Sequence, residues 1–95
     1  MEIKQEQAGS KGIFYVEVAQ KRLAELEYSL AESNLMIINH TEVDDSLKGK
    51  NVGNQLVDAA VEFARAHQLK IFPLCPFANA VMKRKKVQFA DVLRL

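Results

Sequence analysis

Residues 35–75 constrain the fold most, because an apolar run, a glycine-bearing turn, an amphipathic stretch and a second apolar run follow one another there. The continuous apolar start of residues 35–43 predicts a central strand covered on both faces. Apolar residues recur at helical spacing over 52–67, and 70–75 has the composition of a strand. Such a strand–helix–strand unit has a right-handed crossover and parallel strands. Pro73 has no backbone N–H to donate, so we expect the two parallel strands to splay apart near it.

The N-terminal half shows the period of a strand. Residues 12–19 alternate between apolar and polar side chains, and residues 23–30 alternate in the same way after a short polar connection. Leu, Ala and Glu also favour helices, so a helix over 23–30 is the alternative. The period of two and the short connection favour a hairpin instead.

A chain of 95 residues is long enough for one domain with one modest core. We predict a single α+β domain over residues 1–95. Its mixed sheet has antiparallel N-terminal strands, and a short helix over 76–84 follows the second parallel strand. Residues 1–11 are expected to form a mobile lead-in.

Composition excludes several classes of protein. Hydrophobic residues make up 48% of the chain and charged residues 26%, as in ordinary soluble globular proteins and unlike disordered ones. A net charge of +1 gives no general attraction to nucleic acid or acidic membranes. No apolar run is long enough to span a bilayer, and the acidic start lacks a signal-peptide core.

The cysteine and histidine content argues against a disulfide and against a metal site. Cys75 is the only cysteine, which rules out an internal disulfide and fits a reducing cytoplasm, so a cytoplasmic location is expected. His40, His67 and Cys75 lack the spacing of a metal site, and no metal is expected.

The turn over residues 48–53 has the make-up of an anion cradle. Free backbone N–H groups and the positive end of the helix dipole meet at the start of a helix, and both favour phosphate. Gly49 and Gly53 let the backbone approach a ligand closely or adopt a positive φ. Lys48 and Lys50 add positive charge. The turn therefore predicts a phosphorylated cofactor, with an ordinary helix entry as the alternative.

The order of these elements resembles the GNAT acetyltransferase superfamily, and most closely its very small bacterial members. The resemblance runs through most of residues 12–93. It is carried by the stretches His40-Thr41-Glu42-Val43, Leu47-Lys48-Gly49-Lys50-Asn51-Val52-Gly53, Cys75-Pro76-Phe77 and Phe89-Ala90-Asp91-Val92-Leu93.

The family's pyrophosphate motif is Gln or Arg, two residues, Gly, one residue, then Gly or Ala. Lys48 stands at its first position, Asn51 replaces the first glycine, and Gly53 matches. Asn tolerates a left-handed φ better than most residues, so we expect the turn to keep its shape.

The resemblance implies that the chain binds acetyl-CoA. The pyrophosphate would lie on the amides of residues 49–54, and the pantetheine arm would pair like an extra strand between the strands that end near Val43 and Cys75. The basic run over 83–86 is a solvated helix end, a contact for the 3′-phosphate, or a weak signal for nucleic acid, which is not an expected partner. The implied cofactor-binding residues are Val43, Lys48, Gly49, Lys50, Asn51, Val52, Gly53, Asn54, Pro76, Phe77, Asn79, Lys83 and Arg84.

Acetyl transfer to an amine needs a base for the amine proton and often an acid for the leaving thiolate. His40 is the candidate base, and Glu42, two residues on, shares its strand face and is able to orient it. Cys75 precedes a helix start, where a thiol with a lowered pKa is able to take up the acetyl group. The alternatives are a satisfied sheet histidine, a strand-end charge and a buried cysteine acting as a small hydrophobe. The helix after Cys75 offers no tyrosine, the acid of many GNAT enzymes.

We therefore predict an acetyl-CoA-dependent acetyltransferase that acts on an unidentified small-molecule or protein amine. The alternative is a protein that binds CoA or acyl-CoA without turnover. The sequence does not specify the oligomeric state.

Overall fold

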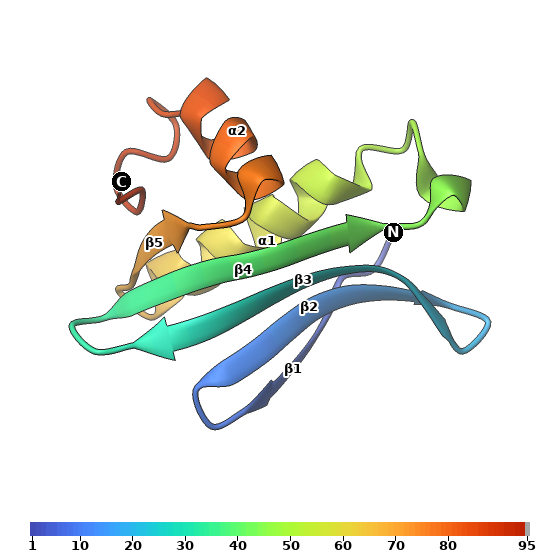
Figure 1. The fold of residues 1–95 in the computed structure, drawn as a ribbon, viewed down its shortest axis with the longest axis horizontal. Helices are drawn as coiled ribbons and strands as arrows, with labels where there is room; N and C mark the ends of the chain where they lie inside the picture. The colour runs from blue at the N-terminus through green and yellow to red at the C-terminus, as the bar shows by residue number, and fades with distance from the viewer. Residues whose placement is uncertain (95) are drawn as a thin grey trace.

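A five-stranded mixed sheet organises the chain in the computed structural model, which describes residues 1–94 (Figure 1). The predicted domain extends to Leu95, which lies outside the described residues. The strands lie side by side in chain order, antiparallel from the first to the fourth, with the fifth parallel to the fourth. The elements are β1 (Lys4–Ala8), β2 (Lys11–Val18), β3 (Lys21–Ala31), β4 (Leu35–Val43), the 3₁₀ turn η1 (Asp45–Leu47), α1 (Val52–Ala66), β5 (Lys70–Pro73) and α2 (Pro76–Arg84).

The core lies between one face of this sheet and the helices. Ala24, Leu26 and Tyr28 of β3 are buried, whereas Glu27 between them is exposed, because successive strand residues point to opposite faces. The apolar stripe of α1 packs on the buried face, and α1 crosses behind the strands in Figure 1. The other face of the sheet carries exposed polar side chains such as Glu27, and none of the described helices packs on it.

Most of the predicted elements are confirmed. The 23–30 segment is a strand that pairs antiparallel with β2, so the helical alternative is excluded. The strand over 35–43 and the helix over 76–84 have the predicted bounds, and α1 ends one residue before the predicted 67. The strand over 70–75 ends earlier, at Pro73.

The N-terminal segment differs from the prediction. Residues 4–8 form β1, which pairs along its length with residues 11–15 of β2, so the prediction of a mobile lead-in over 1–11 is wrong for them. The phenol oxygen of Tyr28 accepts a hydrogen bond from Gln5 Nε2 at 2.7 Å and donates one to Gln7 Oε1 at 2.8 Å. The Tyr28 ring reaches β1 across Gly12, where a Cβ would lie 2.2 Å from its Cζ atom. Two glutamines and a distant tyrosine thus tie down a segment that looks polar and irregular in sequence.

The sheet opens between β4 and β5, as predicted. Their parallel ladder runs from Leu35 paired with Lys70 to Ile38 paired with Pro73, and it goes no further. One more bond follows, from the Cys75 N–H to the Ile38 carbonyl at 3.0 Å. β4 continues to Val43 with β3 on one side, and within residues 1–94 no strand pairs with its other side beyond Ile38.

The C-terminal segment closes the outer edge of β5. The Ile71 N–H donates to the Val92 carbonyl at 2.6 Å, and the Arg94 N–H donates to the Ile71 carbonyl at 2.8 Å. Arg65 of α1 holds this segment, since its guanidinium lies 2.8 and 3.1 Å from the two carboxylate oxygens of Asp91. The Arg65 side chain lowers the pKa of the Asp91 carboxyl below its usual value.

None of the described helices is long and apolar enough to cross a membrane.

The pKa of Asp91 gives a prediction for pH dependence. A carboxyl whose pKa is lowered by folding stabilises the protein above its unfolded pKa, and it loses that contribution as the pH falls through the folded value. Asp91→Asn should therefore lower the free energy of unfolding at neutral pH. The difference from the unsubstituted protein should vanish well below the ordinary value of 3.8. Urea unfolding of both proteins, from neutral pH to below 3.8, measures this difference in the free energy of unfolding. A difference that does not change with pH would contradict the prediction.

Candidate functional site

A β-bulge in β4 sets the arrangement of side chains beside the opening. Glu27 of β3 pairs with His40, but the next residue, Tyr28, pairs with Ile38, so Asn39 is an extra residue in β4. Leu26, which is fully buried, pairs with Thr41. Asn39 and His40 therefore both lie on the polar face, and Thr41 returns to the face covered by the helices.

His40 and Glu42 form a pair on the polar face. His40 Nε2 lies 3.5 Å from Glu42 Oε2, so Glu42 is positioned to orient the imidazole. Their side chains are 55% and 71% exposed, which leaves the pair open to a ligand from solvent. The expectation that the two share a face is confirmed by this contact.

Cys75 lies on the other side of the opening. It is the N-cap residue of α2 and is only 5% exposed, and its Sγ lies 3.5 Å from Thr41 Oγ1. Burial is the largest influence on this thiol and by itself raises its pKa. Hydrogen-bonding groups outweigh it: the amide of Ala78, the hydroxyl of Thr41 and the amide of Phe77 together hold the pKa of Cys75 below its usual value. The surroundings of Cys75 therefore make its thiol more acidic than that of an ordinary cysteine.

The turn before α1 has the backbone of a cradle. Asn51 is the N-cap of α1 and adopts a left-handed conformation with φ of 61°, as expected for the residue in place of the motif glycine. Gly49 has φ of 79°, and a Cβ there would meet nothing within 4 Å. The first hydrogen bond of α1 runs from the Gln55 N–H to the Asn51 carbonyl at 3.1 Å, so the amides of residues 52–54 precede it.

Gly53 has a neighbour that the sequence does not reveal. A Cβ on Gly53 would lie 2.5 Å from Cζ of Phe77, so the ring of Phe77 packs directly over this turn of α1. Phe77 is nevertheless 42% exposed, so part of its ring faces solvent at the border of the cradle. The missing side chain of Gly53 thus lets α2 pack against α1, and it also leaves space for the approach of a ligand.

These features fit a CoA-type ligand: donor amides at a helix start, a strand edge without a partner, and a thiol between them. The sequence profile described as GCN5-related N-acetyl-transferase matches residues 13–92. The chain belongs to the GCN5-related N-acetyltransferase family. Its small single domain and its mixed α+β sheet are those of this family.

Solved structures agree with the family assignment. A GCN5-like protein from Staphylococcus aureus, solved by NMR in solution, is 39% identical, with 98% of this chain and 87% of that chain covered and a TM-score of 0.73. An aminoglycoside acetyltransferase from an uncultured soil metagenomic sample, in complex with sisomicin, is 18% identical (70% and 47% covered, TM-score 0.63). A Bacillus anthracis protein assigned as a streptothricin acetyltransferase, in complex with acetyl-CoA, is 16% identical (70% and 39% covered, TM-score 0.59).

The chain is much shorter than the last two of these proteins and spans less than half of their length. Their likeness shows the fold alone. A comparison with curated proteins gives no match.

The other predicted cofactor-binding residues of this acetyltransferase-family chain differ in their contacts and exposure. Asn79 donates from Nδ2 to the Pro73 carbonyl at 3.3 Å, so its side chain ties α2 to the end of β5. Lys83 and Arg84 are exposed in the last turn of α2, and Arg84 lies about 10 Å along the helix axis from Phe77. Lys48 Nζ is 3.3 Å from Asp45 Oδ1, which partly neutralises it. Among residues 1–94 no cluster of three or more His, Cys, Asp or Glu side chains is able to hold a metal ion.

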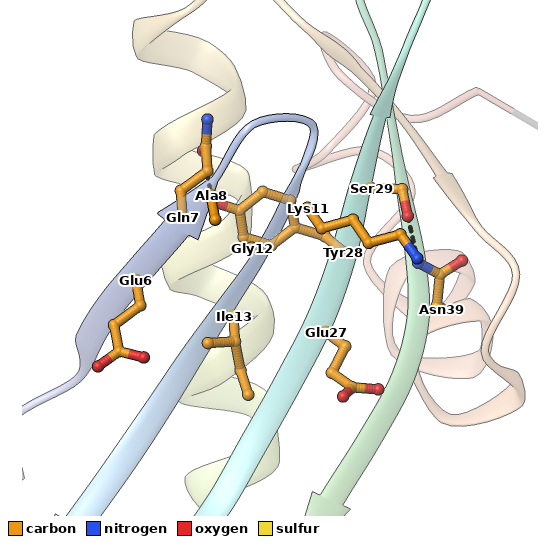
Figure 2. Close-up of a pocket in the computed structure, with 10 residues that line it drawn as sticks. All are labelled: Glu6, Gln7, Ala8, Lys11, Gly12, Ile13, Glu27, Tyr28, Ser29 and Asn39. Atoms are coloured by element: carbon orange, nitrogen blue, oxygen red, sulfur yellow. Dashed lines mark hydrogen bonds between the residues drawn. The ribbon is translucent and has the colours of Figure 1, made fainter.

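Sequence reasoning missed an open hollow of about 810 Å³ on the polar face of the sheet. Figure 2 shows Glu6, Ile13 and Glu27 side by side across β1, β2 and β3 along one edge of it. The bulge residue Asn39 lies at its far side, where its Nδ2 donates to Ser29 Oγ at 2.8 Å. Glu27 is the register partner of His40, so this hollow leads toward the His40–Glu42 pair. The pairing of β1 creates the hollow, and β1 had no strand signal.

The left-handed Asn51 gives a prediction for stability. Asn51→Ala and Asn51→Gly both remove the side-chain contact with Asn54, so they differ only in backbone preference. A left-handed conformation costs a residue with a Cβ about 1–2 kcal/mol, and it costs glycine little. The glycine variant should be more stable than the alanine variant by about 1 kcal/mol in urea unfolding. Equal stabilities would show that residue 51 is not left-handed in solution.

Proposed function

We propose that this chain transfers the acetyl group of acetyl-CoA to an amine. The observation that carries the proposal is the opening between β4 and β5, where residues 39–43 keep an unpaired strand edge beside the Cys75 thiol. A pantetheine arm has amide groups at strand-like spacing, so an edge of this kind suits it. Membership of the acetyltransferase family supports the reaction class.

The diphosphate end of the cosubstrate belongs on the turn before α1. The amides of residues 52–54 precede the first hydrogen bond of α1 and supply donors, whereas the Lys50 N–H is bonded to the Leu47 carbonyl at 3.3 Å. The positive end of the α1 dipole adds a favourable field. Lys50 and the partly neutralised Lys48 are exposed and add charge at the edge of the cradle. The solved acetyl-CoA complex with the same fold supports this choice of ligand.

Cys75 is proposed to carry the acetyl group between the two substrates. Its thiolate forms a bond to the acetyl carbonyl carbon, the bond from that carbon to the CoA sulfur breaks, and CoA leaves as its thiolate. The amine nitrogen then bonds to the same carbon, and the Cys75 sulfur leaves as a thiolate again. The lowered pKa of Cys75 supports both its attack and its departure.

The amine is proposed to enter from the polar face. His40 lies there and takes the proton that the amine gives up, while Glu42 at 3.5 Å stabilises the imidazolium that results. Glu27 opposite His40 borders the same approach and favours a cationic amine. The acceptor and the cosubstrate then reach the opening from different sides of the sheet.

An NMR titration with acetyl-CoA tests the cosubstrate site, with ATP as a control for phosphate binding alone. We expect shift changes in the backbone amides of residues 40–54 and 73–79, because these border the opening and the cradle. Changes confined to other residues, or none with millimolar ligand, would remove the basis of the proposal. Binding without acetyl transfer to any amine would support the non-catalytic alternative.

Gly53 provides a sharper version of this titration. Gly53→Ala should weaken acetyl-CoA binding roughly tenfold, about 1.4 kcal/mol, but its Cβ also meets the Phe77 ring. The double variant Gly53→Ala/Phe77→Ala removes that clash, and Phe77→Ala alone is the matched control. If the double variant still binds more weakly than Phe77→Ala, the Cβ acts on the ligand. Equal binding of these two would assign the whole effect to the contact between the helices.

Cys75→Ala tests the covalent step. Intact mass spectrometry of the unsubstituted protein with acetyl-CoA should show one added acetyl group, and the alanine variant should show none. Acetylation of an amine should fall at least about a hundredfold in the variant, as for loss of a nucleophile. If turnover stays close to normal, Cys75 only lines the site.

A further inference from the structure

Thr41 is the side chain that the structure brings to the Cys75 sulfur. Its Oγ1 lies 3.5 Å from Sγ, and within residues 1–94 no other side chain makes a hydrogen bond to this sulfur. The hydroxyl of Thr41 makes no second hydrogen bond in the same part of the chain. Its hydrogen is therefore available for a bond to the sulfur of Cys75.

The bulge in β4 is the reason for this contact. Ile38 faces the helices, so regular alternation would turn residue 40 toward the helices and residue 41 toward the polar face. The extra residue Asn39 reverses this order, and Thr41 pairs instead with the buried Leu26 on the helix side. One inserted residue thus sends the hydroxyl to the thiol and the imidazole of His40 to the opposite face.

A hydroxyl is suited to both states of a thiol. It accepts a hydrogen bond from the S–H group, and after a rotation of its own hydrogen it donates one to the thiolate. The bond to a charged acceptor is the stronger of the two. Because Cys75 is only 5% exposed, water gives its thiolate little help, and the lost hydroxyl would not be replaced.

We propose that Thr41 is a positioning residue for Cys75: it holds the sulfur beside the opening and donates its hydroxyl hydrogen to the thiolate. The use of this contact in catalysis rests on the proposed acetyl transfer. The contact between Thr41 and Cys75 is present without a ligand. Thr41 acts through Cys75 and does not touch the acetyl group.

Charged groups contribute little to the state of this thiol. The influences that set the pKa of Cys75 are burial and hydrogen bonds from neutral groups of Thr41, Phe77 and Ala78. The titratable side chains on the elements packed around it lie elsewhere. His40 and Glu42 are on the other face of β4, and Lys70 is at the start of β5. Asp58, Glu62 and Arg65 are on the exposed side of α1, and Lys83 and Arg84 are in the last turn of α2.

Titration of the thiol in the full chain tests the proposal. Cys75 is the only cysteine, so the ultraviolet absorbance of the thiolate reports one group once the spectrum of Cys75→Ala has been subtracted. Thr41→Val keeps the shape of the side chain and removes the hydroxyl, and it should lower the thiolate fraction at a given pH below the midpoint about tenfold. The rate of alkylation by iodoacetamide should fall with it. Thr41→Ser restores a hydroxyl and should recover both to within about twofold.

Three outcomes decide the matter. An unchanged titration in a folded Thr41→Val protein would overturn the proposal, and so would an equal loss in Thr41→Ser, since packing alone would then explain it. If Thr41→Val does not fold, the thiolate fraction of Thr41→Ser is compared with that of the unsubstituted protein at the same pH. A difference in this fraction larger than about tenfold would overturn the proposed role of Thr41. Failure of the acetyl-CoA titration is separate: it would remove the proposed function while the effect of Thr41 on the thiol stands.

Discussion

The turn of the chain at Leu74, directly after Pro73, is the constraint on which the site depends. Alternate residues of β5 donate to β4: the Lys70 N–H bonds the Asn34 carbonyl, whereas the Ile71 N–H points outward to Val92, so the missing N–H of Pro73 also lies on the outer side. The ladder ends where Pro73 pairs with Ile38, because the next inward donor, the Leu74 N–H, bonds the Phe72 carbonyl instead. The Pro73 carbonyl is still satisfied, because Asn79 of α2 donates to it. The chain then turns into α2 at Cys75, while β4 runs on alone. Three local features of a short segment thus produce an edge without a partner and a thiol beside it.

The bulge at Asn39 adds the second property of the site, its division between two faces of the sheet. His40 and Glu42 lie on the polar face, and Thr41 and Cys75 lie on the face with the helices. A base in solvent and a thiol in a dry, hydrogen-bonded position have different chemistry, and the sheet keeps them apart. In the proposed reaction this separation lets the cosubstrate and the amine approach one opening from opposite sides.

A domain this small must also protect the edges of its sheet. β1 covers the edge of β2 and is held by the bonds of Gln5 and Gln7 to Tyr28. The C-terminal segment covers β5 through the bridge between Ile71 and Leu93, and Arg65 fixes it through Asp91. The outer edge of β5 is therefore covered, whereas β1 is the edge strand at the other side of the sheet. In the described residues the edge of β4 beyond Ile38 has no partner strand, and this is the edge proposed for the cosubstrate.

The sequence by itself determined the regular elements, because their signals are local. Alternation gave β2 and β3, helical spacing gave α1, and the tolerance of asparagine for a left-handed φ gave the turn at Asn51. Pro73 marked the place where the strands part, although the bond of the Leu74 N–H to the Phe72 carbonyl is what ends the ladder. The tertiary structure decided the pairing of β1, the Phe77 ring over Gly53, and the bulge that turns Thr41 toward Cys75. The pairing of β1 with β2 is a local hairpin, but the bonds of Gln5 and Gln7 to Tyr28 that hold it join distant residues. The contacts of Phe77 with Gly53 and of Thr41 with Cys75 are also distant in the chain, and strand register is fixed by the partner strand and not by either sequence alone.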